Sequence, residues 1–348
     1  MDFGKKTSNK VMVVASGTAG HILPSKEIIN ELLKRGVAVD WLGYKTPLET
    51  DFEDPLLRHI QLHTQSPRTF SRLLSFSFYK NFFLDCKNIL KLYSQNKYQY
   101  ILLTGGFIGF LPGLFAILTR QRMFIYEQNV VLGASNNFFS WYARKIFFGL
   151  QPLITTKKTF YMGQPLRESL LKVNQKSPLE PHLLIIGGSL GSSFFNNALV
   201  DILTQHVEVK SWKITHCCGA QADPKQLTER YRQAGIAAEV FCYTDDIAKY
   251  YEQATKVIAR AGAMTISELL YLKRDALLIP LPNSAGNHQV KNAECAKNIK
   301  NITVCLQHEF NQDILINFLK HSCHNYVSFF EYKYNPTLEI VDQCLNYP

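Results

Sequence analysis

Three short glycine-rich segments carry the residues best suited to chemistry in this sequence. They lie at residues 16–21, 104–109 and 187–191, and each follows a short apolar run. A glycine loop between a strand and a helix lets backbone amides approach a phosphate, and the helix dipole favours the negative charge. None of the loops has the G-x-G-x-x-G or Gly-Lys-Ser/Thr pattern, which disfavours nicotinamide chemistry and P-loop hydrolysis. Together the loops favour a phosphate-bearing ligand.

Two ionisable side chains stand beside expected helix starts. His21 follows the first loop, where a helix N-terminus disfavours imidazolium and leaves a neutral imidazole that can accept a proton. A capping or packing role explains His21 equally well. Glu268 lies three residues after Thr265, and a capping box explains that pair without any ligand. On these residues alone, capping is favoured over a carboxylate that accepts hydrogen bonds from ribose hydroxyls.

Apolar strands alternate with helical segments, which predicts βαβ units and parallel sheets. The expected strands are 11–15, 38–42, 101–103, 123–126, 183–186, 212–216, 238–241, 256–258 and 276–279. The first loop leads to a helix with Pro24 in its first turn and Gly36 at its end. Ligands of open α/β sheets lie beyond the carboxyl ends of the strands, so the glycine loops should mark the site.

Length and composition predict two globular domains. The chain has 348 residues with 46% hydrophobic and 19% charged content, which excludes disordered and collagen-like classes. Turn residues at 151–165 predict a boundary there. We expect an N-terminal domain over 1–162, a C-terminal domain over 163–330, and a terminal helix within 331–348 that returns toward the N-terminal domain. There is no membrane-spanning run and no signal-peptide core at 1–10, which predicts a cytoplasmic protein.

The net charge of +10 lies in one half of the chain. Residues 1–163 hold 20 Lys/Arg against 10 Asp/Glu, whereas residues 164–348 hold 18 of each. This asymmetry predicts that the first half meets an anionic partner, although a solubility surface would also explain it. Nucleic acid ranks low as that partner, because the sequence has no recognised nucleic-acid-binding motif.

Residues 68–83 interleave large apolar and basic side chains, as an interfacial surface on anionic lipid does. Any one of these aromatic residues taken singly is better explained as core. As a cluster in the basic half they predict membrane contact. The residues expected to make this contact are Arg68, Arg72, Leu73, Leu74, Phe76 and Lys80. The eight cysteines show no C-x-x-C pair or zinc-finger spacing, so we predict neither a disulfide nor a metal site.

Taken in order, these segments resemble the MurG family, inverting glycosyltransferases that add N-acetylglucosamine to lipid I in peptidoglycan synthesis. The family's Gly-Gly-Thr-Gly-Gly-His loop corresponds to 16–21, and its second glycine loop to 105–109. Its His-Glu-Gln-Asn and Asn-Pro-Val-Arg signatures correspond to 126–129 and 164–167. The third loop, the run 260–268 and the segment 280–292 complete a resemblance that covers about four-fifths of the chain.

The resemblance implies the GT-B fold of class α/β, in which two doubly wound Rossmann-like domains face a central cleft. It also implies metal-independent chemistry without a cofactor. UDP-N-acetylglucosamine would lie on the C-terminal domain, with Ser189 at its phosphates, Thr244 at the uracil, Arg167 supporting the nucleotide and Glu268 on the ribose. The other implied donor-site residues are Asn196, Ala263, Met264, Thr265, Ile266, Ser267, His288, Gln289 and Asn292.

The N-terminal domain would bind lipid I. The implied base for the acceptor hydroxyl is His21, with Glu127 and Asn129 nearby. The loops that would cradle the substrate and its diphosphate contain Gly17, Thr18, Ala19, Gly20, Gly105 and Gly106. The implied location is the cytoplasmic face of the bacterial inner membrane, as a peripheral protein on anionic lipid, with other cell-wall synthesis proteins as further partners.

Several positions depart from the family signatures. Ser16 and Ala19 replace loop glycines, Tyr126 replaces the signature His, and Gln164 replaces the Asn before proline. Thr244 stands where an aliphatic residue is usual. These departures leave two alternatives open: a UDP-sugar transferase for another lipid acceptor, and a catalytically weakened homologue that scaffolds cell-wall enzymes.

Overall fold

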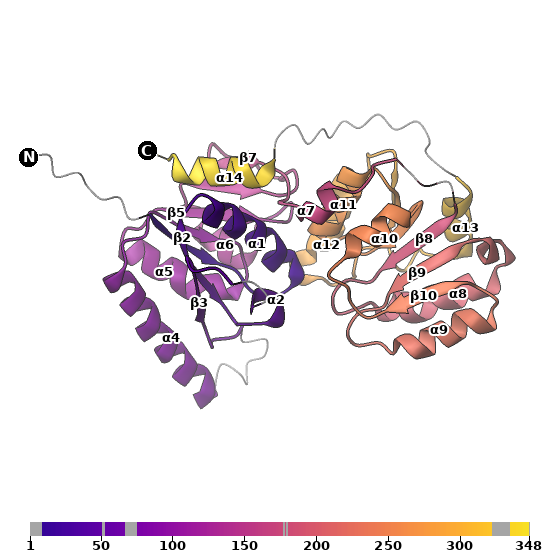
Figure 1. Cartoon of the computed structure of the whole chain (residues 1–348), viewed down its shortest axis with the longest axis horizontal. Helices are drawn as coiled ribbons and strands as arrows, with labels where there is room; N and C mark the ends of the chain where they lie inside the picture. Colours follow the sequence, from indigo (N-terminus) through magenta and orange to yellow (C-terminus); the bar gives the residue numbers. More distant parts are fainter. Residues whose placement is uncertain are drawn as a thin grey trace, which may run out of the picture. The chain divides into compact units, whose positions relative to one another are not determined.

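The structure is a computed structural model that describes residues 9–50, 53–66, 75–176, 178, 180–321 and 335–347. The chain forms two compact units that divide between Pro165 and Leu166, and the C-terminal helix belongs to the first unit (Figure 1). Each unit is a parallel sheet with helices on both faces. The prediction of two doubly wound α/β domains is therefore confirmed.

The first unit is built on a seven-stranded parallel sheet. Its strands are β1 (Lys10–Val14), β2 (Ala38–Gly43), β3 (Leu57–Gln61), β4 (Ile101–Leu103), β5 (Met123–Glu127), β6 (Lys145–Phe148) and β7 (Thr159–Tyr161). They lie in the order β3-β2-β1-β4-β5-β6-β7. Strand β1 pairs with both β2 and β4, so the direction of strand addition reverses there. Such a switch point opens a ligand-binding crevice at the carboxyl ends of the two strands.

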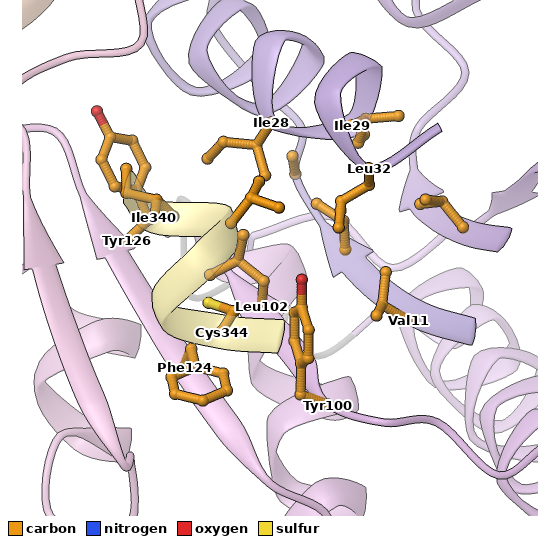
Figure 2. Close-up of a cluster of buried hydrophobic side chains, with 14 of the residues drawn as sticks. Val11, Ile28, Ile29, Leu32, Tyr100, Leu102, Phe124, Tyr126, Ile340 and Cys344 are labelled. Carbon is orange, nitrogen blue, oxygen red and sulfur yellow. The ribbon is translucent and has the colours of Figure 1, made fainter. Parts of the chain in front are cut away.

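Two groups of helices cover this sheet. The helices are α1 (Ala19–Lys34), α2 (Pro47–Thr50), α4 (Phe76–Gln95), η1 (Phe107–Gly109), α5 (Phe110–Leu118), α6 (Ala134–Phe139) and α14 (Pro336–Leu345). On one face, α14 places Ile340 and Cys344 against Leu32 of α1 and Phe124 of β5 (Figure 2). Side chains of α4, α5 and α6 pack on the other face. The C-terminal helix therefore completes the core of the first unit.

The start of α1 differs from the prediction. The helix begins at Ala19, after Thr18 in an extended conformation (φ −90°, ψ 162°), so Pro24 lies in the second turn rather than the first. Proline there removes only the amide that would bond the carbonyl of Gly20. Consequently His21 lies inside the first helical turn. The helix ends at Lys34, and Gly36 follows with φ +72°, as predicted.

The second unit repeats the plan with six parallel strands. They are β8 (His182–Ile186), β9 (Lys213–Cys217), β10 (Ala238–Phe241), β11 (Lys256–Ala259), β12 (Asp275–Leu278) and β13 (Ile302–Val304), in the order β10-β9-β8-β11-β12-β13. The helices are α7 (Glu168–Leu171), η2 (a π-helix, Phe195–Leu199), α8 (Val200–Gln205), η3 (Val207–Ser211), α9 (Pro224–Gln233), α10 (Ile247–Gln253), α11 (Ala263–Leu272), η4 (Ala285–Asn287), α12 (His288–Ala296) and α13 (Gln312–Lys320). Its switch point lies between β8 and β11.

All nine predicted strands are present, each displaced by at most one residue at either end. The prediction missed β3, β6, β7 and β13. Among the described helices, none is long and apolar enough to cross a membrane.

Candidate functional site

The first candidate site lies at the switch point between β1 and β4. His21 is the third residue of α1, and its Nδ1 lies 3.0 Å from the backbone carbonyl oxygen of Thr104, directly after β4. A carbonyl can only accept, so Nδ1 must carry the proton. The neutral imidazole therefore keeps its lone pair on Nε2, which is the form that a general base requires.

Gly105 leaves the space that this imidazole occupies. A Cβ at residue 105 would lie 3.2 Å from Cε1 of His21, and the residue has φ +96°, which side chains other than glycine rarely adopt. Gly17 and Gly106 also have positive φ values. The glycines expected at the diphosphate therefore also shape the surroundings of the histidine.

The first turn of α1 offers backbone donors beside His21. The carbonyl of Thr18 accepts from the amides of His21 (3.0 Å) and Ile22 (3.2 Å). The amides of Ala19 and Gly20 precede these and have no carbonyl within the helix to bond. A helix N-terminus with open amides suits an anion such as a diphosphate.

Glu127 holds the loop that follows β5. Its carboxylate is buried and accepts from the amide (3.2 Å) and the Nδ2 (2.9 Å) of Asn129, the amide of Gly133 (3.0 Å) and the Nδ2 of Asn136 (2.9 Å). Both oxygens are occupied by fixed donors. Glu127 thus holds Asn129 and the start of α6 in place.

In the second unit, the glycine loop 187–191 packs on the end of β9. Gly191 has φ +82°, and a Cβ there would overlap the carbonyl of Cys218. The carbonyl of Ser189 accepts from the amide of Ala220 at 3.3 Å. Nδ2 of Asn196 donates to the same Cys218 carbonyl at 3.0 Å. Asn196 therefore supports the loop, whereas Ser189 lies at its tip.

The N-cap of α11 corrects the capping-box prediction. Gly262, with φ −69° and ψ 142°, is the N-cap, and Thr265 is the third residue of the helix. Since the helix starts at Ala263, Glu268 lies in its second turn and cannot close a capping box. The carboxylate of Glu268 is thereby left for another role.

The first turn of α11 is a second set of open backbone donors. The amide of Ile266 bonds the carbonyl of Gly262 at 2.9 Å, so the amides of residues 263–265 have no helical partner. In the predicted run 263–268, every side chain except that of Thr265 is buried. What Ala263, Met264 and Thr265 can offer a ligand is therefore their backbone amides.

Glu268 is bonded on both oxygens. Its Oε1 lies 3.4 Å from Nη2 of Arg167, and its Oε2 accepts from the hydroxyl of Tyr251 at 2.9 Å. Burial raises the pKa of Glu268, while the Arg167 charge and the Tyr251 hydroxyl oppose that rise. Arg167 also donates to the carbonyl of Asp245 at 3.2 Å. The arginine thus joins the carboxylate to the loop that contains Thr244.

The hydroxyl of Thr244 accepts from the amide of Asp246 at 3.1 Å. The side chain is therefore committed to a local turn. What Thr244 can offer the expected uracil ring is its backbone amide and carbonyl. This explains why a threonine is compatible with a position where an aliphatic residue is usual.

The last predicted donor residues lie at the start of α12. Oε1 of Gln289 accepts from the amide of Leu281 at 2.9 Å, and His288 is the first residue of the helix. Asn292 is fully buried and donates to the carbonyl of Ala261 at 3.4 Å. Gln289 can thus offer its amide nitrogen to a ligand, whereas Asn292 holds α12 against the loop after β11.

Arg260 was predicted only as part of a motif, and the structure gives it a definite place. Its guanidinium is buried and donates to the hydroxyl of Ser192 (2.7 Å) and to Oε1 of Gln307 (2.8 Å). Burial lowers the pKa of Arg260 to about 10. A cavity of about 540 Å³ in the second unit has Arg260, Gly191 and Leu281 in its lining. The residue puts positive charge close to the glycine loop.

The chain matches two family models. One, for the glycosyltransferase family 28 N-terminal domain, covers residues 11–148, and one for the C-terminal domain of that family covers residues 182–338. Together they span most of both units.

Two bacterial relatives carry the same name, UDP-N-acetylglucosamine–N-acetylmuramyl-(pentapeptide) pyrophosphoryl-undecaprenol N-acetylglucosamine transferase. The relative from Vesicomyosocius okutanii is 32% identical over 293 residues, which is 83% of this chain and 82% of that one. The relative from Hydrogenovibrio crunogenus is 29% identical over 322 residues, with 89% and 88% covered. The crystal structure of Acinetobacter baumannii MurG superposes with a TM-score of 0.76 at 24% identity, covering 96% of this chain and 99% of that one.

Proposed function

The chain belongs to the MurG family of glycosyltransferases, and from that premise we propose that it transfers N-acetylglucosamine from UDP-N-acetylglucosamine to the muramyl hydroxyl of lipid I. The observation that carries this proposal is the pair of switch-point sites. One combines open amides with a histidine whose lone pair is on Nε2, and the other combines open amides with a buried carboxylate. The first suits an acceptor diphosphate and hydroxyl, and the second suits a nucleotide.

In the donor site, Glu268 accepts hydrogen bonds from the ribose hydroxyls, and Arg167 keeps the carboxylate oriented toward the loop of Thr244. The amides of residues 263–265 bind the diphosphate together with the loop of Ser189. As the anomeric C–O bond breaks, negative charge develops on the departing UDP. Open amides and the buried Arg260 cation stabilise that charge because they are fixed before the reaction.

In the acceptor site, the loop amides beside His21 hold the diphosphate of lipid I. Nε2 of His21 takes the proton from the muramyl hydroxyl as its oxygen attacks the anomeric carbon. One bond forms and one breaks at that carbon in a single displacement, so its configuration inverts. The hydrogen bond from Nδ1 to Thr104 stabilises the imidazolium that results, and Glu127 positions Asn129 beside the acceptor.

Helix α4 supports a membrane-facing role for the first unit. Phe76, Tyr79 and Phe83 are 85%, 48% and 68% exposed, and they alternate along one side of the helix with exposed lysines such as Lys80. The helix has one acidic residue, Asp85, and it is buried. Apolar rings interleaved with lysines suit the headgroup region of anionic lipid, and lipid I is displayed there.

Of the residues predicted to contact the membrane, Phe76 and Lys80 lie on this exposed side of α4. Arg68, Arg72, Leu73 and Leu74 lie outside the described residues. A peripheral position at the cytoplasmic face of the inner membrane is part of the proposal.

The test supplies UDP-N-acetylglucosamine labelled in the sugar, a soluble lipid I analogue and EDTA. The proposal expects labelled lipid-linked disaccharide, with no product when the acceptor is a polyprenyl monophosphate or a diphosphate that lacks the muramyl sugar. Transfer to one of those acceptors in place of lipid I would contradict it. So would UDP binding without transfer to lipid I.

A further inference from the structure

Two residues that depart from the family signatures, Tyr126 and Gln164, are bonded to each other. The hydroxyl of Tyr126 donates to Oε1 of Gln164, and both side chains have no exposed surface. Nε2 of Gln164 donates to the backbone carbonyl of Gln128 at 2.8 Å. Because that carbonyl can only accept, it fixes which end of the amide is nitrogen, and the Tyr126 hydroxyl must then donate.

The bonds continue from Gln128 to the histidine. Nε2 of Gln128 donates at 3.0 Å to the carbonyl of Thr104, the same oxygen that accepts from Nδ1 of His21. Thr104 is itself fixed, because its amide and hydroxyl both donate to the carbonyl of Val14, at 3.1 and 3.0 Å. An unbroken series of hydrogen bonds therefore connects Tyr126 to the imidazole.

The backbone at Gly149 makes room for the glutamine. A Cβ at residue 149 would overlap the amide of Gln164, and the amide of Gly149 is bonded to the carbonyl of Glu127 at 2.8 Å. The side chain of Gln164 is thus confined between this backbone and Tyr126. A shorter Asn at 164 could not span both of its present partners, and a His at 126 would carry its donor nearer to the main chain.

We propose that Tyr126 and Gln164 are a matched pair of positioning residues for the transfer reaction. They orient Gln128 and thereby hold the Thr104 carbonyl on Nδ1 of His21, which keeps the lone pair on Nε2. Neither residue touches a substrate, since both are buried and act through Gln128. The kinetic part of this proposal rests on the proposed function, whereas the part that concerns the imidazole proton does not.

The imidazole is observed directly by nitrogen NMR of protein labelled with ¹⁵N-histidine. The His21 signals are identified by their loss in His21→Gln. At a pH where His21 is neutral, the parent should show a protonated Nδ1 and an unprotonated Nε2. Tyr126→Phe should show a mixture of the two tautomers, and Gln164→Asn provides the same comparison if Tyr126→Phe does not fold.

The matched control is Tyr142→Phe, which removes a tyrosine hydroxyl bonded to the carbonyl of Gln121 at 3.0 Å in the same unit. It should leave the His21 signals unchanged. Unchanged His21 signals in both Tyr126→Phe and Gln164→Asn overturn the proposal, whether or not the protein acts on lipid I. A protein that lacks transfer activity but shows the expected tautomer change rejects the proposed function and supports the positioning role.

Kinetics test the matching of the pair. Tyr126→Phe should lower kcat by about tenfold, because small displacements of a base are costly, and leave KM for UDP-N-acetylglucosamine within about twofold. Tyr126→His and Gln164→Asn should each lower kcat, and the double variant should recover most of the loss, as coupled residues do. If the losses of kcat in the two single variants add up in the double variant, Tyr126 and Gln164 are not a matched pair.

Discussion

The hydroxyl of Ser16 donates a 2.6 Å hydrogen bond to Glu49, a carboxylate with no exposed surface. The other oxygen of Glu49 accepts from the amide of Lys45 at 2.7 Å. Ser16 stands where the family has a loop glycine, so in this chain the first loop also organises the turn after β2. The departure thus adds a buried contact at the base of the loop.

Ser16→Ala should lower the free energy of unfolding by about 1–3 kcal/mol, because a buried carboxylate oxygen loses its donor. Urea unfolding measures the change. The matched control is Ser94→Ala, whose hydroxyl bonds the carbonyl of Lys91 at an exposed position and whose loss should change stability by less than about 0.5 kcal/mol. Equal effects of the two substitutions would contradict the role of Ser16.

Glu268→Gln should weaken UDP binding by about tenfold or more, because the ribose loses hydrogen bonds to a charged acceptor. Isothermal titration calorimetry measures the affinity. Glu229→Gln, at an exposed carboxylate paired with Arg232, should bind UDP as the parent does. Parent-like UDP affinity in Glu268→Gln would show that the Glu268 carboxylate does not bind the ribose.

The same carboxylate predicts a pH dependence of UDP binding. Burial raises the pKa of Glu268, so it takes up a proton at a higher pH than an exposed glutamate. The protonated form is the weaker acceptor for ribose hydroxyls. UDP affinity of the parent should therefore fall as the pH is lowered from 7 through this raised pKa, and the Glu268 contribution to that fall should be missing in Glu268→Gln. Identical pH profiles for the two proteins would contradict the assignment.

His216 predicts loss of stability in mild acid. It is fully buried on β9, where burial lowers its pKa to about 4. The unfolded chain takes up this proton near pH 6.5 and the native chain only near pH 4, so the unfolded state binds more protons in between and stability falls as the pH falls. At about 1.4 kcal/mol per unit, the loss across this window is roughly 3 kcal/mol.

Urea unfolding between pH 7 and pH 4 tests this prediction. His216→Gln should show a shallower fall of the unfolding free energy than the parent. His308→Gln, at a histidine whose side chain is 78% exposed, should keep the slope of the parent. A parent-like slope in His216→Gln would contradict the assignment.

Phe76→Glu/Phe83→Glu should reduce binding to vesicles that contain phosphatidylglycerol by at least about tenfold. The double variant replaces two apolar rings, which would be buried in the lipid, by carboxylates. Vesicle sedimentation at low salt measures the bound fraction. Val207→Glu, at a 73% exposed apolar residue of the second unit, is the control and should bind as the parent does. Equal binding by all three proteins would reject α4 as the membrane-facing helix.

The central strands could be predicted because they are continuous apolar runs buried on both faces. Three of the four missed strands, β3, β7 and β13, lie at sheet edges and lack that signal, whereas β6 is a buried apolar run of only four residues. β3 reads Leu-Arg-His-Ile-Gln and lies at the sheet edge, half buried, and β13 has three residues with one exposed. Edge strands need fewer apolar residues because one of their sides has no neighbouring strand.

The sites were predictable where a motif carried them and not where tertiary contacts did. The N-cap of α11 is a glycine, which has no side chain that could indicate a cap in the sequence. Thr265, three residues before Glu268, has the spacing of a capping box although it lies inside the helix. Tyr251 contacts Glu268 from α10, a separate helix, and nothing in the local sequence of either residue indicates the other. The Tyr126–Gln164 bond likewise depends on strand and loop meeting in space.

The most direct test of the account compares the transfer of labelled N-acetylglucosamine to the lipid I analogue by the parent, His21→Ala and His308→Ala. The parent and the exposed-histidine control should form lipid-linked disaccharide at the same rate. His21→Ala should be slower by about 10²–10⁴-fold with unchanged UDP affinity, since it lacks the base. Disaccharide formed by His21→Ala at the parent's rate, or none formed by the parent, would contradict the account.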